Sequence, residues 1–289
     1  MAPHRLKIHA HPTMRNVRMV LGFSGWMNGG EVSTGTIETL VQKLDARPLA
    51  EIDSEDFYIF SFPGSMEVSS LFRPYTKIEE GLITAFQGPA NTFFYSEPHN
   101  LILFVGKEPN FKWPEYGECM FSLASQFGVS MIYFIGSVAG LVPHTREPRL
   151  FSSVSDPGLK PAMQGLGARF SSYEGPASIS TYLTRLSSQK GIPMANLVAE
   201  IPPYVQGKNH RCIEAMTRRL AGILNLHIEL DDLRALADRL EERLNEAVQA
   251  HPELLERIQK LEEDYDNEVF DTQMGDLKDW LERKGIRLD

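Results

Sequence analysis

The chain has 289 residues, of which 42% are hydrophobic and 23% charged, a composition typical of folded proteins that excludes wholesale disorder. The net charge of −9 lies entirely in residues 231–289, since residues 1–230 hold equal numbers of acidic and basic side chains. With no basic excess, nucleic-acid binding is not expected. The two cysteines, Cys119 and Cys212, are far apart and lack CxxC spacing, so neither a disulfide framework nor a zinc site is predicted.

Short apolar runs alternate with helical periodicity along residues 1–230. Apolar runs bounded by glycine and proline predict strands at 17–23, 57–62, 75–78, 82–86, 91–95, 101–106, 129–137, 167–173 and 197–201. Apolar residues at helical spacing predict helices at 32–44, 116–127, 176–189 and 212–224. Because the apolar residues of the central strands form continuous rather than alternating runs, these strands are expected to be buried on both faces. The fold class is therefore α/β, a three-layer α/β/α sandwich with a mostly parallel or mixed sheet.

The hydrophobic pattern of the sequence changes after Leu230. Leucines recur every three or four residues up to Val248, Pro252 interrupts them, and the pattern resumes from Leu254 to Leu261. This predicts a helical hairpin or a kinked helix pair, with a further short helix around 277–284. The predicted organisation is an α/β/α domain over 1–230 and an acidic helical extension over 231–289. The extension either packs on its own domain, the favoured interpretation, or serves as an interaction arm.

Two features bear on localisation. The N-terminal residues have no apolar core after their basic residues, so a signal peptide is not predicted. Residues 119–145 carry no formal charge, but serines, glycines and a glutamine interrupt the run, which favours a buried helix and strand over a membrane span. A cytoplasmic protein without a membrane partner is expected.

Polar and glycine-rich segments follow several predicted strands, where open parallel sheets bind ligands. After the first strand come Trp26, Asn28, Gly29 and Glu31, whose backbone N–H groups can hold an anion. A tight turn capped by Asn28 explains the same residues. No Walker, GxGxxG or GxSxG pattern is present, so no cofactor and no catalytic nucleophile are predicted. His9 and His11 lack an evident third ligand, so no metal is predicted.

Later strand ends supply the remaining candidate ligand-binding residues, which are Glu108, Asn110, His144, Arg146, Glu174 and Tyr204. A histidine near its ordinary pKa can act as a general acid or base, and an arginine can clamp a carboxylate or phosphate. Alternatively, His144 and Arg146 satisfy loop carbonyls or pair with Glu108 or Glu174. Glu174 is also favourable near a helix N-terminus without any catalytic duty, and Tyr204 either lines a cleft or packs.

Five segments stand in this order along the chain: Gly25-Trp26-Met27-Asn28-Gly29-Gly30-Glu31, Glu108-Pro109-Asn110 with Trp113, Pro143-His144-Thr145-Arg146, Tyr173-Glu174-Gly175-Pro176 and Pro202-Pro203-Tyr204-Val205. Together they resemble the proteasome assembly chaperone family, family-two type, and Leu261-Glu262-Glu263-Asp264-Tyr265-Asp266 fits its long prokaryotic form. The resemblance covers residues 15–265. It implies a sandwich similar to nucleoside phosphorylases and peptidyl hydrolases, self-association as trimers, and no settled catalytic role for the matching residues.

Eukaryotic members of that family help proteasome α-subunits to form rings. Members that dock on proteasomes often end in a hydrophobic–Tyr–any tail, whereas this sequence ends in Gly285-Ile286-Arg287-Leu288-Asp289, so docking through such a tail is not implied. The first hypothesis is therefore a non-enzymatic, homo-oligomeric assembly-chaperone-like or protein-interaction protein. The alternative is a small-molecule (nucleoside-like or amide) binding protein, or a hydrolase- or phosphorylase-like enzyme, with its site at the strand carboxyl ends.

Overall fold

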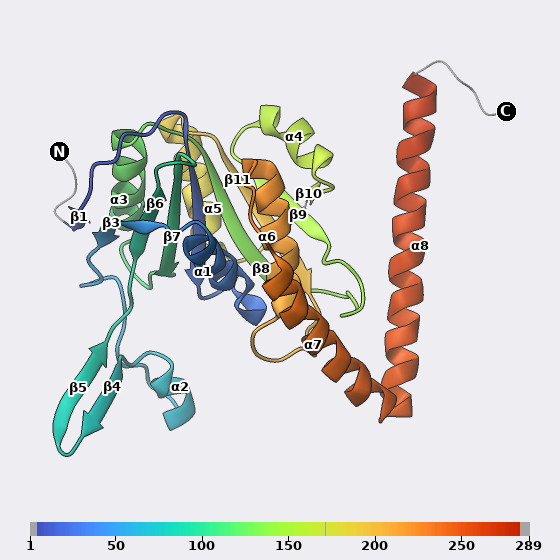
Figure 1. The fold of residues 1–289 in the computed structure, drawn as a ribbon, viewed down its shortest axis with the longest axis horizontal. Helices are drawn as coiled ribbons and strands as arrows, with labels where there is room; N and C mark the ends of the chain where they lie inside the picture. The colour runs from blue at the N-terminus through green and yellow to red at the C-terminus, as the bar shows by residue number, and fades with distance from the viewer. Residues whose placement is uncertain (1–4, 171, 284–289) are drawn as a thin grey trace.

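The structure is a computed structural model that describes residues 5–170 and 172–283 (Figure 1). Its described residues form a nine-stranded mixed sheet in the order β1-β3-β6-β7-β2-β8-β11-β9-β10. These strands are β1 (Leu6–Ile8), β2 (Val17–Ser24), β3 (Arg47–Ile52), β6 (Thr92–Ser96), β7 (Leu101–Lys107), β8 (Val129–Ala139), β9 (Leu150–Val154), β10 (Arg169–Phe170) and β11 (Met194–Ile201). The central strands β7, β2, β8 and β11 are mutually parallel, and antiparallel pairs flank them on both sides.

Helices cover both faces of the sheet. The covering helices are α1 (Val32–Lys43), α3 (Trp113–Gln126), α4 (Lys160–Gly165), α5 (Ile179–Lys190) and α6 (His210–Leu224), with short 3₁₀ turns at Gly29–Glu31 and Pro157–Leu159. One apolar core lies under α3 and α5, and the other under α1, α4 and α6. The expected α/β/α sandwich is therefore confirmed. Because side chains alternate along a strand, Met19 and Leu21 enter the first core and Val20 the second.

Glycine permits the close contact between β2 and α1. A Cβ atom at Gly22 would lie 2.7 Å from the carbonyl oxygen of Ser33. The Ser33 hydroxyl also accepts a hydrogen bond from the backbone N–H of Phe23 at 3.0 Å and donates to the carbonyl of Ile135 in β8. The first turn of α1 is thus fixed to two strands, which positions the loop between β2 and α1 at the carboxyl end of the sheet.

Most predicted elements are confirmed, with three corrections. Residues 57–62 are not a strand: Phe57 is fully buried against Tyr116, with ring centroids 5.1 Å apart, and the chain then leaves the sheet. Strands β1, β3 and β9 and helix α4 were not predicted. Helix α5 begins at Ile179, after Ser178 caps it, so Pro176 lies outside the helix.

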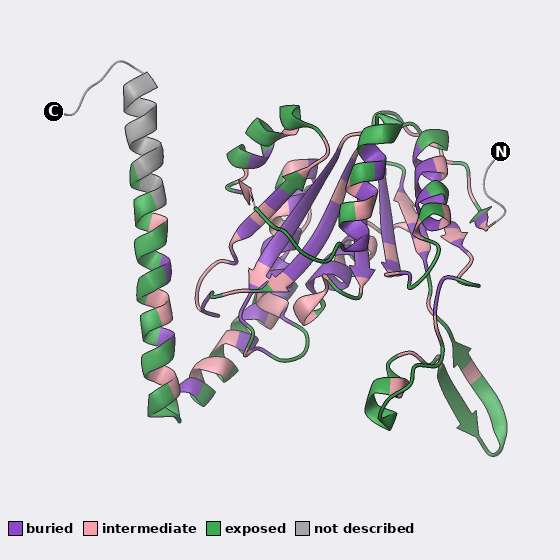
Figure 2. Cartoon of the chain, turned by 180° about the vertical axis from the view of Figure 1, so that it is seen from behind, coloured by how far each residue is buried: buried purple, intermediate pink, exposed green. Residues whose placement is uncertain are grey.

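Residues 60–87, hereafter the arm, project from the body below the sheet (Figure 1). The arm contains α2 (Met66–Ser70) and a separate antiparallel hairpin of β4 (Tyr75–Glu79) and β5 (Leu82–Gln87). The sequence predicted both strands, and the structure places them in a sheet of their own, apart from the main sheet. Almost every residue of the arm is exposed (Figure 2).

The acidic extension is a helix pair, as the interruption at Pro252 predicts. Helix α7 (Asp231–Gln249) packs on α6, and after a turn at Ala250 and His251 helix α8 (Pro252–Arg283) runs back beside the body (Figure 1). The short helix expected around 277–284 is the end of α8 as far as Arg283. The tail at 285–289 lies outside the described residues. No described helix is both long and apolar enough to cross a membrane.

Candidate functional site

The carboxyl ends of the parallel strands bring most of the predicted site residues to one edge of the sheet. The loops after β2, β7, β8 and β11 carry Trp26 to Glu31, Glu108 and Asn110, His144 and Arg146, and Tyr204 respectively. Within this edge the residues fall into separate groups, each tied to a different part of the chain.

Glu108 joins two loops. Its Oε2 atom accepts the backbone N–H of Trp26 at 2.9 Å, and its Oε1 atom accepts the backbone N–H of Ile179, the first residue of α5, at 2.8 Å. Gly25, with a φ of +136°, makes room for this contact, because a Cβ atom there would lie 2.8 Å from the Glu108 Cβ. Both carboxylate oxygens are therefore already engaged within the chain.

The loop after β2 is a capped turn. The Oδ1 atom of Asn28 accepts the backbone N–H of Thr34 at 3.1 Å, and the Gly29 carbonyl accepts a hydrogen bond from the Ser137 hydroxyl at 2.7 Å. This geometry matches the turn capped by Asn28 that the sequence offered as one interpretation. The side chains of Trp26 and Glu31 point outward and are exposed.

His144 is buried in a hydrogen-bonded chain with Tyr204 and Asn245 of α7. The backbone N–H of His144 donates to the Tyr204 hydroxyl at 2.9 Å, Nδ1 lies 3.0 Å from the same oxygen, and Nε2 lies 3.0 Å from Asn245 Oδ1. All three bonds are satisfied when the hydroxyl donates to Nδ1 and Nε2 carries the proton. Burial raises the pKa of Tyr204 to about 12, so its hydroxyl keeps its proton at neutral pH.

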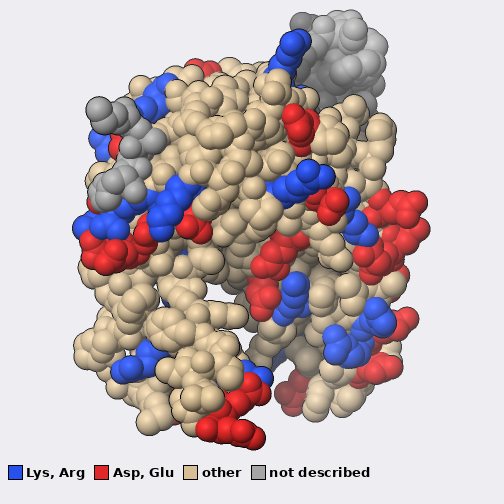
Figure 3. Space-filling model, turned by 60° about the vertical axis from the view of Figure 1, so that its left-hand side comes forward, with Lys and Arg blue, Asp and Glu red and all other residues tan. Residues whose placement is uncertain are grey.

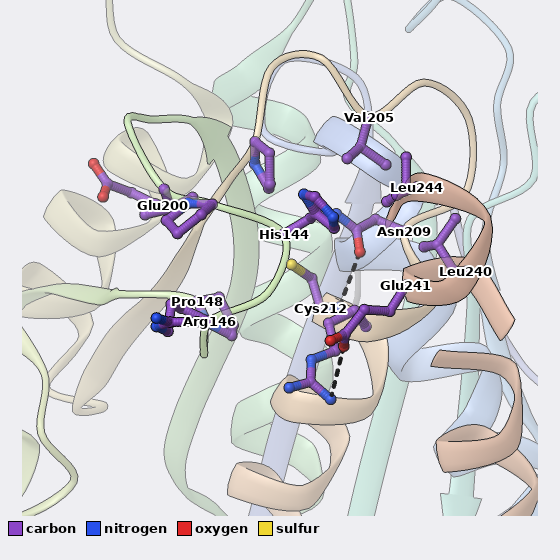
Figure 4. Close-up of a pocket in the computed structure, with 14 residues that line it drawn as sticks. His144, Arg146, Pro148, Glu200, Val205, Asn209, Cys212, Leu240, Glu241 and Leu244 are labelled. Carbon is purple, nitrogen blue, oxygen red and sulfur yellow. Dashed lines mark hydrogen bonds and ion pairs between the residues drawn. The ribbon is translucent and has the colours of Figure 1, made fainter. Parts of the chain in front are cut away.

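The space beside His144 is nearly filled. The pocket between the β8–β9 loop, α6 and α7 encloses about 10 Å³, the room of a single water molecule (Figure 4). Leu240 and Leu244 close it from α7, and Arg211 pairs with Glu241 across it at 3.7 Å. Burial raises the pKa of the Cys212 thiol there to about 12, which keeps the thiol protonated at neutral pH.

Arg146 does clamp a carboxylate, but that carboxylate belongs to α8. Its Nε and Nη2 atoms bind the two oxygens of Asp266 at 2.9 and 2.8 Å, and Nη1 lies 3.7 Å from Glu262. The hydrogen bond to Arg146 lowers the pKa of Asp266 below its ordinary value. The sequence had offered Glu108 or Glu174 as partners of Arg146, and neither contacts it.

Two more arginines extend this contact. Arg149 in the β8–β9 loop and Arg169 in β10 both pair with Glu268, and the Arg149 guanidinium lies over the Tyr265 ring, 4.7 Å from its centroid. The Tyr265 hydroxyl donates to the Glu147 carbonyl at 2.8 Å. Hereafter Arg146, Arg149 and Arg169 are called the arginine cluster.

The other predicted residues lie apart from these groups. Asn110 is exposed, and its Oδ1 atom accepts the backbone N–H of Ile59 at 3.2 Å. Glu174 is exposed and lies five residues before α5 begins. No cluster of three or more metal-ligating side chains occurs among the described residues.

Sequence reasoning missed the partners that α7 and α8 supply, namely Asn245, Glu262, Asp266 and Glu268. The signals were the concentration of acidic residues in 231–289 and the segment 261–266, which fits the long form of the resembled family. Within the arginine cluster only Arg146 was a predicted candidate. Arg149 and Arg169 carried no signal, since they are separated in the chain and come together through the pairing of β9 with β10.

Comparison with models of known protein families shows to which family this chain belongs. Residues 22–248 match the model of the PAC2 family. The chain belongs to this family. A comparison with curated proteins finds no significant match.

Solved PAC2-like structures share the fold. A proteasome-assembly chaperone homologue from Mycobacterium tuberculosis is 25% identical with a TM-score of 0.73, over 84% of this chain and 100% of that one. A second M. tuberculosis protein, of unknown function, is 20% identical with a TM-score of 0.81, over 96% and 94% of the two chains. An archaeal proteasome activator from Pyrococcus furiosus is 19% identical with a TM-score of 0.62, over 84% and 97%.

Proposed function

We propose that this PAC2-family protein is a non-enzymatic, self-associating protein of the assembly-chaperone type, and that the arm is its protein-contact surface. The observation that carries the proposal is the exposed apolar surface of the arm. Of sixteen large hydrophobic side chains exposed among the described residues, ten lie in the arm: Phe60, Phe62, Met66, Val68, Leu71, Tyr75, Ile78, Leu82, Ile83 and Phe86. Monomeric proteins rarely expose such a contiguous surface unless it binds a partner.

The hairpin of the arm has one mainly apolar face. Cross-strand pairs share a side of the sheet, and the pairs Thr76–Phe86 and Ile78–Ile83 lie on the same side. Ile78, Ile83 and Phe86 are 62%, 69% and 70% exposed, so this apolar face, defined by these three residues, has no cover within the chain. Figure 3 shows the arm at lower left, mostly without charge and set off from the body by a hollow.

Physical arguments favour an arm whose apolar face is buried against another protein chain when the protein functions. A two-stranded hairpin with no packing partner is at best marginally stable in water. Burying the three side chains of the apolar face would contribute on the order of 1.5–3 kcal/mol for each. A second copy of the chain is the partner expected from the family resemblance, and the trimer that it implies would have three times the chain mass of 32.6 kDa.

The engaged side chains of the predicted site support a protein-binding role as well. The carboxylate of Glu108, the ring of His144 and the guanidinium of Arg146 are all engaged by groups of the same chain. The cavity beside His144, of about 10 Å³, does not hold a drug-sized or nucleoside-sized ligand, and the space of about 510 Å³ lined by Ser24, Glu38 and Lys107 contains none of the predicted site residues. The division into a domain over 1–230 and an extension over 231–289 belongs to the same proposal, with the extension closing the strand ends.

The test compares two neighbouring lysine substitutions in β5. Phe86→Lys places a charge on the apolar face, whereas Gln87→Lys places the same charge on the opposite side of the hairpin. Sedimentation velocity should find the wild type and Gln87→Lys as oligomers and Phe86→Lys as a monomer with unchanged circular dichroism. A wild type that stays monomeric at every concentration, or a Phe86→Lys protein that still assembles, would refute the proposal.

A further inference from the structure

The contact between α8 and the body is mainly ionic. On the body side the arginine cluster projects from the β8–β9 loop and β10, on the side of the molecule away from the arm (Figure 1). On the α8 side stand Glu262, Asp266 and Glu268, and the Thr145 hydroxyl donates to Glu262. The carboxylates are 23%, 54% and 45% exposed, so water and salt reach this contact.

Little apolar surface holds α8 in place. Among the described side chains of this helix, only Ile258 and Tyr265 are buried. Further along, Phe270 and Met274 are 62% and 48% exposed, and Figure 2 shows the described part of α8 mostly as exposed surface. Ion pairs that water reaches contribute about 0–1 kcal/mol each. A helix held in this way can leave its site without unfolding the sandwich.

We infer that the arginine cluster is a docking site for an acidic helix of a partner protein, and that α8 is the internal ligand that occupies it. The site binds carboxylates through a bidentate guanidinium, the geometry in which arginine recognises them best. It also accepts an aromatic ring beneath Arg149 and offers the Glu147 carbonyl to a hydroxyl, as Tyr265 shows.

The internal ligand defines the partner's chemistry. Glu262, Tyr265 and Asp266 lie three and four residues apart, which places them on one face of a helix. A competing partner therefore presents a helix with two acidic residues one turn apart and a tyrosine between them. Because α8 is tethered, its effective concentration at the site is high, and a partner binds only weakly while α8 is in place.

The experiment uses a labelled peptide of residues 255–270, with blocked ends, as the probe. Its binding to the full chain is followed by fluorescence anisotropy. In one variant, hereafter the weakened variant, Glu262→Gln, Asp266→Asn and Glu268→Gln together weaken the contact between α8 and the arginine cluster. A matched control carries Glu256→Gln, Glu263→Gln and Asp264→Asn, which change the same charge at exposed positions of the same helix.

The weakened variant should bind the peptide about tenfold or more tightly than the wild type and the control, because the tethered competitor is gone. Adding Arg146→Ala to the weakened variant should abolish the gain, and Arg146→Lys should restore part of it. Salt should weaken binding. A peptide with the three carboxylates changed to amides should not bind.

Equal binding to the weakened variant and the control would overturn the inference, as would binding that persists with the amide peptide. A pull-down tests self-binding, with Phe86→Lys added to both proteins so that the arm does not contribute. If the weakened variant captures the chain with an intact α8, the site binds a second copy of this chain, and the inference of a partner protein is overturned. These readouts do not depend on the arm, so failure here leaves the proposed function standing.

Discussion

Removing the Glu108 carboxylate tests whether this predicted ligand residue instead holds the structure together. Its two oxygens accept the backbone N–H groups of Trp26 and Ile179 at 2.9 and 2.8 Å. Hydrogen bonds to a charged group contribute about 1.5–3 kcal/mol each, and the Ile179 N–H is left without an acceptor in a buried residue. Trp26 is exposed, so water replaces most of its bond. Glu108→Ala should therefore lower the free energy of unfolding by about 2–4 kcal/mol.

Glu108→Gln is the sharper comparison. An amide keeps one oxygen acceptor but offers an NH₂ group to the second N–H donor, so about half of the loss is expected. Urea unfolding followed by fluorescence measures both variants, and Glu31→Ala, an exposed glutamate of the neighbouring loop, is the control. If Glu108→Ala is as stable as the control, the reasoning fails and Glu108 is free to serve a ligand.

Three further predictions concern the core, the β2–α1 contact and α8. Asn91→Ala removes the buried oxygen that accepts two tyrosine hydroxyls at 2.7 and 3.0 Å, and should cost about 2–4 kcal/mol by urea unfolding; a change within experimental error would contradict it. Gly22→Ala should cost about 1–3 kcal/mol, because the added methyl meets backbone at 2.7 Å, whereas Gly222→Ala, in open space on α6, should be neutral or stabilising; equal stabilities would argue against the tight contact. The pKa of Asp266 is lowered by Arg146, so its stabilisation is present above the ordinary carboxyl pKa of 3.8 and is lost as the pH falls through the lowered value. Small-angle scattering should then report release of α8 only below about pH 4 in the wild type and at a higher pH in Asp266→Asn; release at the same pH in both proteins would contradict the assignment.

Periodicity predicted the layers of this fold because each layer is a local pattern. The apolar run from Met19 to Phe23 in β2 requires two covered faces, and α1 and α3 supply one cover each. The short strands outside the parallel centre of the sheet were less predictable. Strand β3 contains Pro48 and two exposed residues at its start, so it lacks both the apolar run and the clean alternation of a strand.

The wrong strand at 57–62 has a physical cause. Phe57 and Tyr58 are buried as strand residues would be, but they fill a space under Tyr116, and the Tyr58 hydroxyl binds Asn91 at 2.7 Å. Apolar content alone does not separate a buried loop from a strand. The chain then enters the arm. The apolar side chains of the arm are exposed, but their sequence pattern is the same as that of a half-buried sheet.

The sequence predicted the position of the site residues but not their partners. Arg146 was expected to clamp an anion, and the anion is Asp266, 120 residues along the chain. Strand-end position follows from local pattern, whereas the partner of a side chain depends on how α7 and α8 fold back. The acidic excess of the extension was visible in the sequence, but its complement in the arginine cluster exists only in three dimensions.

Amide hydrogen exchange over the arm tests the central claim most directly. If the apolar face is covered by another protein chain, residues 75–87 should exchange slowly in the wild type and rapidly in Phe86→Lys, while the central strand β2 stays protected in both. Gln87→Lys should match the wild type. Rapid exchange across the hairpin in an assembled wild type, equal to that in Phe86→Lys, would show that the arm is not the contact surface.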